Sequence, residues 1–223
     1  MMTIENLTAQ STFLKSICHQ LYEARSNYHL LGLIEAGMSL QGMTSNMVSA
    51  LSKYPVLQWA MVPRREKDLI ELAPYLIDLS FIEADKDEAI TTFSEWLFKQ
   101  KSLSTWGLFI ISDNSFSEIL PTLRSFLYIH FEKQRSYFRY FHPRFFDSFW
   151  KDLGEKDKCK FLEYVGIVFY FDFYNSEIIH FSSIVNGDLR DVAFNLDNNI
   201  TKELSNLLIE KKVISKKKDA SHG

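Results

Sequence analysis

The chain has 223 residues, 46% of them hydrophobic and 24% charged, so it can bury a full core in one domain with a small appendage. Its net charge of -3 is unevenly distributed: residues 201–223 carry a balance of +3, which leaves -6 for the first 200 residues. An acidic body argues against non-specific binding of nucleic acid, because that binding needs clustered cations to neutralise phosphates.

The two cysteines, Cys18 and Cys159, are too few for a disulfide scaffold. Cys18 has apolar neighbours at helical spacing, so we expect a buried thiol in a reducing compartment. The N-terminus shows no basic region followed by an apolar run, and no apolar stretch approaches the roughly 18 residues that a membrane span requires. These features predict a cytoplasmic protein.

Helices and strands are expected to alternate along the first 150 residues. Apolar spacing predicts helices over 8–25, 45–53 and 85–101, and near-continuous apolar runs predict strands over 28–34, 56–62, 72–79 and 106–112. Ser115 and Glu118 have capping-box spacing and open a helix to about residue 128. Residues 136–141 alternate as a strand does, and Pro143 suits the first position of an aromatic helix. The alternation predicts an α/β fold with a mixed sheet flanked by helices.

The pattern changes after Asp152, at a charged break. A short helix through Tyr164 is expected, followed by a hairpin over 167–185 that turns at Asn175-Ser176 and a second tight turn at Asn186-Gly187. A terminal helix over 201–213 should dock on its own body or lie in a partner's groove. We therefore expect an α/β domain over 1–152, a C-terminal α+β extension over 153–213 packed on it, and a disordered basic tail over 214–223.

Three carboxylates, Glu35, Asp78 and Asp113, each follow an apolar run, where α/β enzymes place active sites. We favour a capping role for them, because no His or Lys is obviously paired with them. The sequence lacks a phosphate-binding glycine motif, a nucleophile elbow and metal-ligand spacing of His or Cys, so no cofactor or metal is expected. A small α/β enzyme using these carboxylates remains the alternative function.

Residues 131–150 interleave nine aromatics with Lys133, Arg135, Arg139 and Arg144. Such a pattern suits a platform for single-stranded nucleic acid, on which bases stack and cations follow phosphates. We favour a structural role in which the aromatics enter a core, given the acidic body. Arg139 then needs a counter-charge, and we expect a carboxylate such as Glu35 or Asp113 beside it.

Five segments in a fixed order resemble one protein family. They are Leu33-Ile34-Glu35-Ala36-Gly37, Ala73-Pro74-Tyr75-Leu76, Trp106-Gly107-Leu108-Phe109-Ile110-Ile111-Ser112, Thr122-Leu123-Arg124 and Arg139-Tyr140-Phe141-His142-Pro143-Arg144-Phe145-Phe146. Together they resemble the effector adaptor (chaperone) domain of bacterial type VI secretion systems, over about residues 28 to 170. Glu35 and His142 stand where the family commonly has Asp, although His142 could still cap the helix that follows it.

The resemblance implies a non-enzymatic cytoplasmic chaperone without a cofactor. Such a protein binds the N-terminal region of a toxin effector and loads it onto the valine-glycine-repeat spike protein; it binds neither nucleic acid nor membrane. Aromatic and Arg-rich surfaces, which supply the anchors of protein interfaces, are compatible with that role. By resemblance, the structural or partner-binding residues are Glu35, Pro74, Trp106, Gly107, Arg124, Arg139, His142, Pro143 and Arg144.

Overall fold

The computed structural model describes residues 9–23, 27–35, 58–60, 74–80, 107–131, 134–196 and residues 200, 202, 206 and 209, and the statements below concern this part of the chain. The helices expected over 45–53 and 85–101, Trp106 and the basic tail lie outside the described residues. Of the helix expected over 201–213, only residues 202, 206 and 209 are described, and all three are helical.

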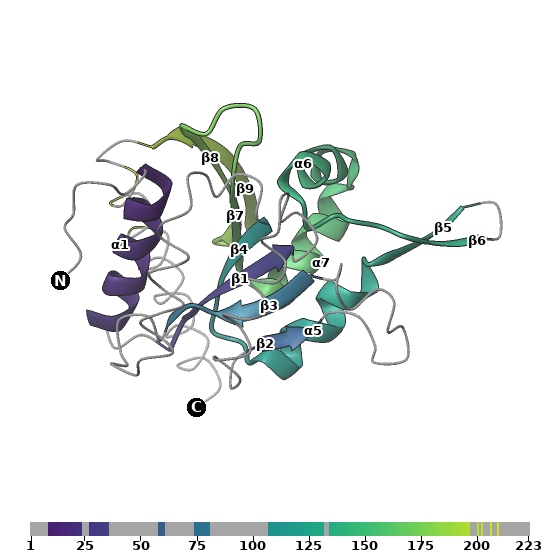
Figure 1. The fold of residues 1–223 in the computed structure, drawn as a ribbon, viewed down its shortest axis with the longest axis horizontal. Coiled ribbons are helices and arrows are strands. Elements are labelled where there is room, and N and C mark those ends of the chain that lie inside the picture. The colour runs from purple at the N-terminus through teal and green to yellow at the C-terminus, as the bar shows by residue number, and fades with distance from the viewer. Residues whose placement is uncertain are drawn as a thin grey trace, which may run out of the picture.

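A seven-stranded sheet, in the spatial order β2-β3-β1-β4-β7-β8-β9, forms the centre of the fold. In that order the strands are β2 (Gln58–Ala60), β3 (Pro74–Asp78), β1 (His29–Glu35), β4 (Gly107–Ser112), β7 (Ile167–Phe171), β8 (Ile178–Val185) and β9 (Asp188–Asn195). A separate ribbon of β5 (Tyr128–Phe131) and β6 (Gln134–Tyr137) projects from the body (Figure 1).

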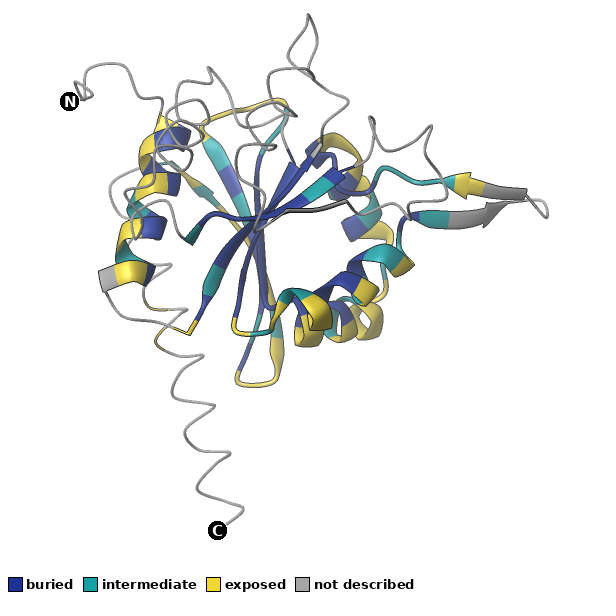
Figure 2. Ribbon diagram, turned by 60° about the horizontal axis from the view of Figure 1, so that its bottom comes forward, coloured by how far each residue is buried: buried dark blue, intermediate teal, exposed yellow. Residues whose placement is uncertain are grey.

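Helices cover both faces of the sheet. On one side lies α1 (Ala9–Glu23); on the other lie α5 (Phe116–Ser125), α6 (Pro143–Asp152) and α7 (Glu155–Val165) (Figure 1). Each face has its own hydrophobic core, and the central strands send alternate side chains into the two cores, as Leu30 and Leu31 of β1 do. The central strands are consequently buried along their length (Figure 2), which confirms the predicted α/β fold with flanking helices.

The strand directions differ from the expected mixed sheet. Each pair of neighbouring strands in the described part of the sheet is antiparallel, including β1 with both β3 and β4. The apolar runs in β1 and β4 arise because helices cover both faces of the sheet. Such runs do not indicate whether neighbouring strands are parallel or antiparallel. Burial on both faces is typical of parallel sheets, but here an antiparallel sheet has the same coverage.

Residues 167–195 extend this same sheet. The expected hairpin is confirmed, because β7 pairs with β8 across the turn that contains Asn175. The second tight turn is confirmed as well: Asn186 and Gly187 have φ of 56° and 91°, the left-handed values that a two-residue hairpin turn requires. The predicted C-terminal extension therefore contributes three strands to the central sheet.

The segment between α5 and α6 was only partly predicted. Pro121 lies inside α5, which ends at Ser125, and the chain then forms the β5–β6 ribbon. The expected strand over 136–141 is wrong beyond Tyr137, where β6 ends. Tyr140 and Phe141, which a strand would send to opposite faces, lie in a turn and enter the same core.

Candidate protein-binding surface

Three of the five family segments meet at the end of β1. In the sheet, Glu35 lies opposite Pro74 of β3, and Ile34 lies opposite Gly107 of β4. Gly107 has a φ of 154°, and a Cβ atom placed on it would lie 1.9 Å from the carbonyl oxygen of Leu33. The glycine at this position therefore lets β1 and β4 approach each other.

The aromatic part of the last segment is built into the core that α5, α6 and α7 cover. Tyr140, Phe141 and Phe146 are each 0% exposed. The Tyr140 hydroxyl donates a hydrogen bond of 2.8 Å to the carbonyl oxygen of Leu123 in α5, and burial raises the pKa of Tyr140 well above its usual value. The favoured structural role is thus confirmed for these three aromatics, but it is wrong for Phe145, which is 44% exposed and does not belong to this core.

His142 begins α6 in place of the family's usual Asp. Its Nδ1 atom accepts a hydrogen bond of 3.2 Å from the backbone N–H of Arg144, and Pro143 follows at the first helical position. Burial, assisted by the charges of Arg139 and Arg144, lowers the pKa of His142 to about 4. The residue is therefore a neutral N-cap at pH 7, as its spacing to the helix had suggested.

Arg144 and Phe145 are exposed, although Phe146, the next residue, is buried in the core. The Arg144 side chain is exposed, its guanidinium carbon lies 6.0 Å from the centre of the Phe173 ring, and the next residue, Phe145, is 44% exposed. Tyr174, in the loop between β7 and β8, is 79% exposed. We call Arg144, Phe145, Phe173 and Tyr174 the Arg144 surface; with neighbouring side chains it lines a hollow of about 330 Å³.

Two carboxylates line the same hollow, and both are satisfied within the chain. Asp147 accepts hydrogen bonds from Lys151 Nζ at 2.7 Å and from the Tyr170 hydroxyl at 3.0 Å. Asp172 has three partners, which are the backbone N–H groups of Tyr174 and Asn175 through Oδ1 and the His180 ring through Oδ2. Burial alone would raise the pKa of Asp172, but these hydrogen bonds and the His180 charge lower it.

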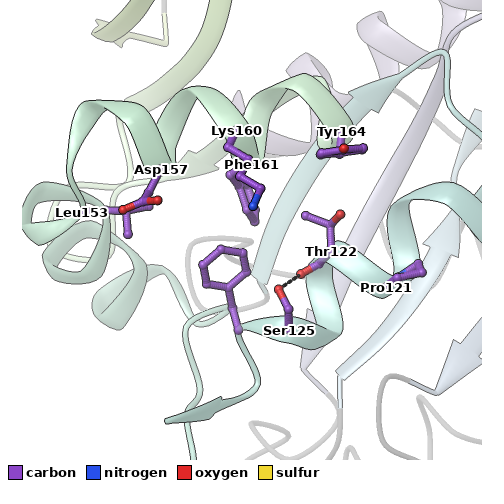
Figure 3. A pocket seen from close by; sticks show the side chains of 9 residues that line it. Pro121, Thr122, Ser125, Leu153, Asp157, Lys160, Phe161 and Tyr164 are labelled. Atoms are coloured by element: carbon purple, nitrogen blue, oxygen red, sulfur yellow. Dashed lines mark hydrogen bonds between the residues drawn. The ribbon is translucent and has the colours of Figure 1, made fainter. Parts of the chain in front are cut away.

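A second hollow, of about 470 Å³, lies between α5 and α7, and we call it the α5–α7 groove (Figure 3). Phe126 and Phe161 meet edge to face in it, with ring centres 5.2 Å apart. Asp157 and Lys160 of α7 line one wall of the groove, and Thr122 and Ser125 of α5 line the opposite wall (Figure 3). The Ser125 hydroxyl donates a hydrogen bond to the Thr122 carbonyl oxygen. The groove begins where α6 ends, because Leu153 also lines it.

The three candidate catalytic carboxylates are not brought together. Glu35 ends β1 opposite the start of β3, whereas Asp78 lies opposite Leu31, towards the start of β1. Asp78 is buried, and its Oδ1 accepts from the Ser80 N–H at 2.8 Å, which is the expected loop cap. Its Oδ2 lies 3.1 Å from His29 Nδ1, so the expectation that no histidine pairs with these carboxylates is wrong for Asp78. Asp113 is exposed after β4.

Arg139 is half-buried next to His142. The Glu35 side chain lies outside the described residues, so the expected pairing of Arg139 with a carboxylate stays a prediction. Arg124 lies in the last turn of α5, and its carbonyl oxygen accepts from the Leu127 N–H at 3.2 Å. The Cys18 thiol is buried, as predicted, and donates to the Leu79 carbonyl oxygen at 3.5 Å, and neither Cys18 nor Cys159 forms a disulfide.

The described residues include neither a metal-binding cluster nor a membrane-spanning helix. They contain no group of three or more His, Cys, Asp or Glu side chains that could hold a metal ion. No helix among them combines the length and the apolar character needed to cross a bilayer.

Sequence reasoning identified Arg144 but not the aromatic residues beside it. Phe173 and Tyr174 come from the β7–β8 loop, and their position next to α6 depends on how β7 packs against that helix. The sequence does contain a signal for a turn at this position, because an Asp side chain readily accepts hydrogen bonds from backbone N–H groups two and three residues later. Asp172 accepts in this way from Tyr174 and Asn175.

The comparisons with known proteins bear on the family alone. No curated protein and no solved structure matches the chain. Residues 48–160 match the family described as Domain of unknown function (DUF4123), a range that contains four of the five segments, from Ala73 to Phe146. Because this range spans half of its residues, the chain belongs to the DUF4123 family.

Proposed function

We propose that this chain is a non-enzymatic adaptor of a type VI secretion system. It binds the N-terminal region of a toxin effector in the cytoplasm and loads the toxin onto the valine-glycine-repeat spike protein. The observation that carries the proposal is the Arg144 surface, where the last family segment exposes an arginine among aromatic rings. Arginine and aromatic side chains supply most of the binding energy in protein interfaces.

An adaptor has to hold two partners at once, and the chain offers two separate hollows for that purpose. The Arg144 surface lies at the start of α6 and the α5–α7 groove lies at its end. Ser148 is the last α6 residue that lines the first hollow and Leu153 lines the second, so at a rise of about 1.5 Å per residue roughly 7 Å of helix separates them. Two polypeptide segments can occupy sites at that distance without overlapping.

The proposal is tested by co-expressing the tagged chain with the spike protein and the toxin encoded beside its gene. We expect a complex of all three proteins to survive affinity purification and gel filtration. A double variant, Phe145→Ser with Tyr174→Ser, should lose at least one partner, because both side chains are exposed in the native fold. Lys15→Gln, on α1 at the other face of the sheet, serves as the matched control and should retain both.

A wild-type chain that binds neither the spike nor the toxin would refute the adaptor function. So would a gene that stands apart from every spike and effector gene, because the proposed partners would then be missing. Loss of both partners from Lys15→Gln would show that the assay reports the overall charge of the chain rather than a particular surface.

A further inference from the structure

Among the charged side chains that line the hollow of the Arg144 surface, one makes no contact with an opposite charge in the described part of the chain. Three charged side chains line this hollow, and the two acidic ones, Asp147 and Asp172, already accept hydrogen bonds from groups of the same chain. The third is Arg144, whose guanidinium lies over the Phe173 ring and has no carboxylate partner among the described residues. The hollow therefore presents one guanidinium whose N–H donors are not taken up by a carboxylate of the described residues.

The surroundings of this cation are apolar and partly exposed. Phe145 and Tyr174, which line the same hollow, are 44% and 79% exposed. A guanidinium offers several N–H donors in a plane, and this arrangement matches the two oxygens of a carboxylate. Rings beside it would cover the apolar neighbours of that carboxylate and shield the pair from water.

We propose that the Arg144 surface binds an acidic side chain, Asp or Glu, that stands next to apolar residues in an exposed segment of a partner protein. The inference rests on the adaptor function proposed above, and it adds the chemistry by which one of the two partners is recognised. Arg144 makes the ion pair, and Phe145, Phe173 and Tyr174 make the apolar contacts.

An arginine among rings could also hold single-stranded nucleic acid, but the charges of this hollow favour a peptide. A nucleic-acid platform needs several cations that follow successive phosphates. Here Lys151 is engaged by Asp147, which leaves Arg144 as the single cation of the hollow without an ion pair, next to two carboxylates. Successive phosphates would meet Asp147 and Asp172, whereas a single carboxylate can reach Arg144 alone.

The experiment uses the full 223-residue chain and a phage-displayed library of random short peptides. Peptides retained by the immobilised chain should be enriched in Asp or Glu next to aliphatic or aromatic residues. Synthetic copies should bind Arg144→Gln about tenfold more weakly or worse, as expected for an interface anchor. Arg144→Lys, which keeps the charge but loses the planar donor arrangement, should lie between the two. Lys15→Gln should bind as the wild type does.

A double-mutant cycle separates a direct contact from a general effect of charge. Replacing the peptide's Asp by Asn, or Glu by Gln, should cost about as much as Arg144→Gln, and the two changes together should cost little more than either one. Independent, additive losses would overturn the proposed ion pair. Selected peptides without an acidic residue, or peptides that bind Arg144→Gln as tightly as the wild type, would overturn the inference as well.

A thymidine oligonucleotide provides the remaining arm of the test. If it binds the wild type and loses affinity in Arg144→Gln, the surface takes nucleic acid and the peptide inference is wrong. Failure of this inference is distinguishable from failure of the adaptor function. A chain that co-purifies with spike and toxin but selects peptides without using Arg144 refutes the inference alone. A chain that selects acidic peptides through Arg144 yet binds neither protein refutes the adaptor function alone.

Discussion

Replacing Gly107 with serine should separate the two central strands of the sheet. A Cβ atom at this position would lie 1.9 Å from the Leu33 carbonyl oxygen, 2.9 Å from the Leu33 carbonyl carbon and 3.2 Å from Ile34 Cα. All three are backbone atoms of β1, which is paired on both sides and cannot rotate away as a side chain can. Ordinary contact begins at 3.4 Å, so β1 and β4 would have to move apart by about 1.5 Å locally.

The cost of Gly107→Ser has two parts. A non-glycine residue at a positive φ loses roughly 1–2 kcal/mol, and forcing extra atoms into a packed site adds about 1–3 kcal/mol. Together these amount to about 2–5 kcal/mol, which is a large fraction of the roughly 5–15 kcal/mol that stabilises a typical domain. We therefore expect a clearly lower free energy of unfolding, or a chain that fails to fold at 37 °C.

Urea denaturation followed by tryptophan fluorescence measures this loss. The matched control is Gly154→Ser, which adds the same atoms at the N-cap of α7, where the nearest neighbour of the new Cβ is Asp157 Oδ2 at 3.9 Å. Serine is a favoured N-cap, so the control should be neutral or slightly stabilising. If Gly107→Ser unfolds within about 0.5 kcal/mol of the wild type, the close approach of β1 and β4 is wrong.

Three further substitutions test the last family segment. The free energy of unfolding of the wild type should fall as the pH drops from 6.5 to about 4, because the folded state holds His142 neutral while the unfolded chain takes up a proton. The loss is roughly 3 kcal/mol. It should be absent from His142→Asn, which keeps an oxygen that can cap α6. Tyr140→Phe leaves the Leu123 carbonyl without its donor and should cost about 1–2 kcal/mol in urea denaturation; an unchanged midpoint would contradict this bond. Arg139→Ala should lower the melting temperature and raise the pKa of His142 in an NMR titration, since the Arg139 charge contributes to its low value; an unmoved pKa would place Arg139 too far away to act.

The sequence predicted the buried parts of the fold better than their arrangement. Apolar runs identified β1 and β4, and the Asn186-Gly187 pair identified the β8–β9 turn, because burial and turn geometry are local properties of a few residues. Strand direction depends on how distant segments pair, and the apolar run of a strand covered on both faces is the same in either direction. The β5–β6 ribbon was missed because the helix was expected to run to about residue 128, where β5 begins, and the four residues of β5 are too few to show a strand pattern.

The candidate site was half visible in the sequence for a similar reason. His142, Pro143 and Arg144 are consecutive, so their relation to the start of α6 could be read from spacing alone. Phe173 approaches Arg144 only after β7 has packed beneath α6, and no local pattern encodes that contact.

The core beneath α6 fixes Arg144 and Phe145 of α6 relative to Phe173 and Tyr174 of the β7–β8 loop. Phe146 stacks on Trp150 in α6 and meets Tyr170 of β7 edge to face, with ring centres 5.3 Å apart in both cases. The Tyr170 hydroxyl also donates to Asp147 of α6, so this helix and the strand that leads into the β7–β8 loop are joined twice. Phe146 has no exposed surface and cannot touch a partner.

Phe146→Leu should therefore weaken the binding of acidic peptides, although the substitution changes no residue of the Arg144 surface itself. The substitution leaves a gap under α6, at a cost below the roughly 3–5 kcal/mol of a buried Phe→Ala change, so the chain stays folded. With the gap, α6 and the β7–β8 loop can shift relative to each other, and Arg144 and Tyr174 no longer meet the same ligand at once. Leu162→Ala, in α7 and the same core, is the control for lost stability alone. Equal binding losses in the two variants would show that affinity follows stability, and not the alignment of α6 with β7.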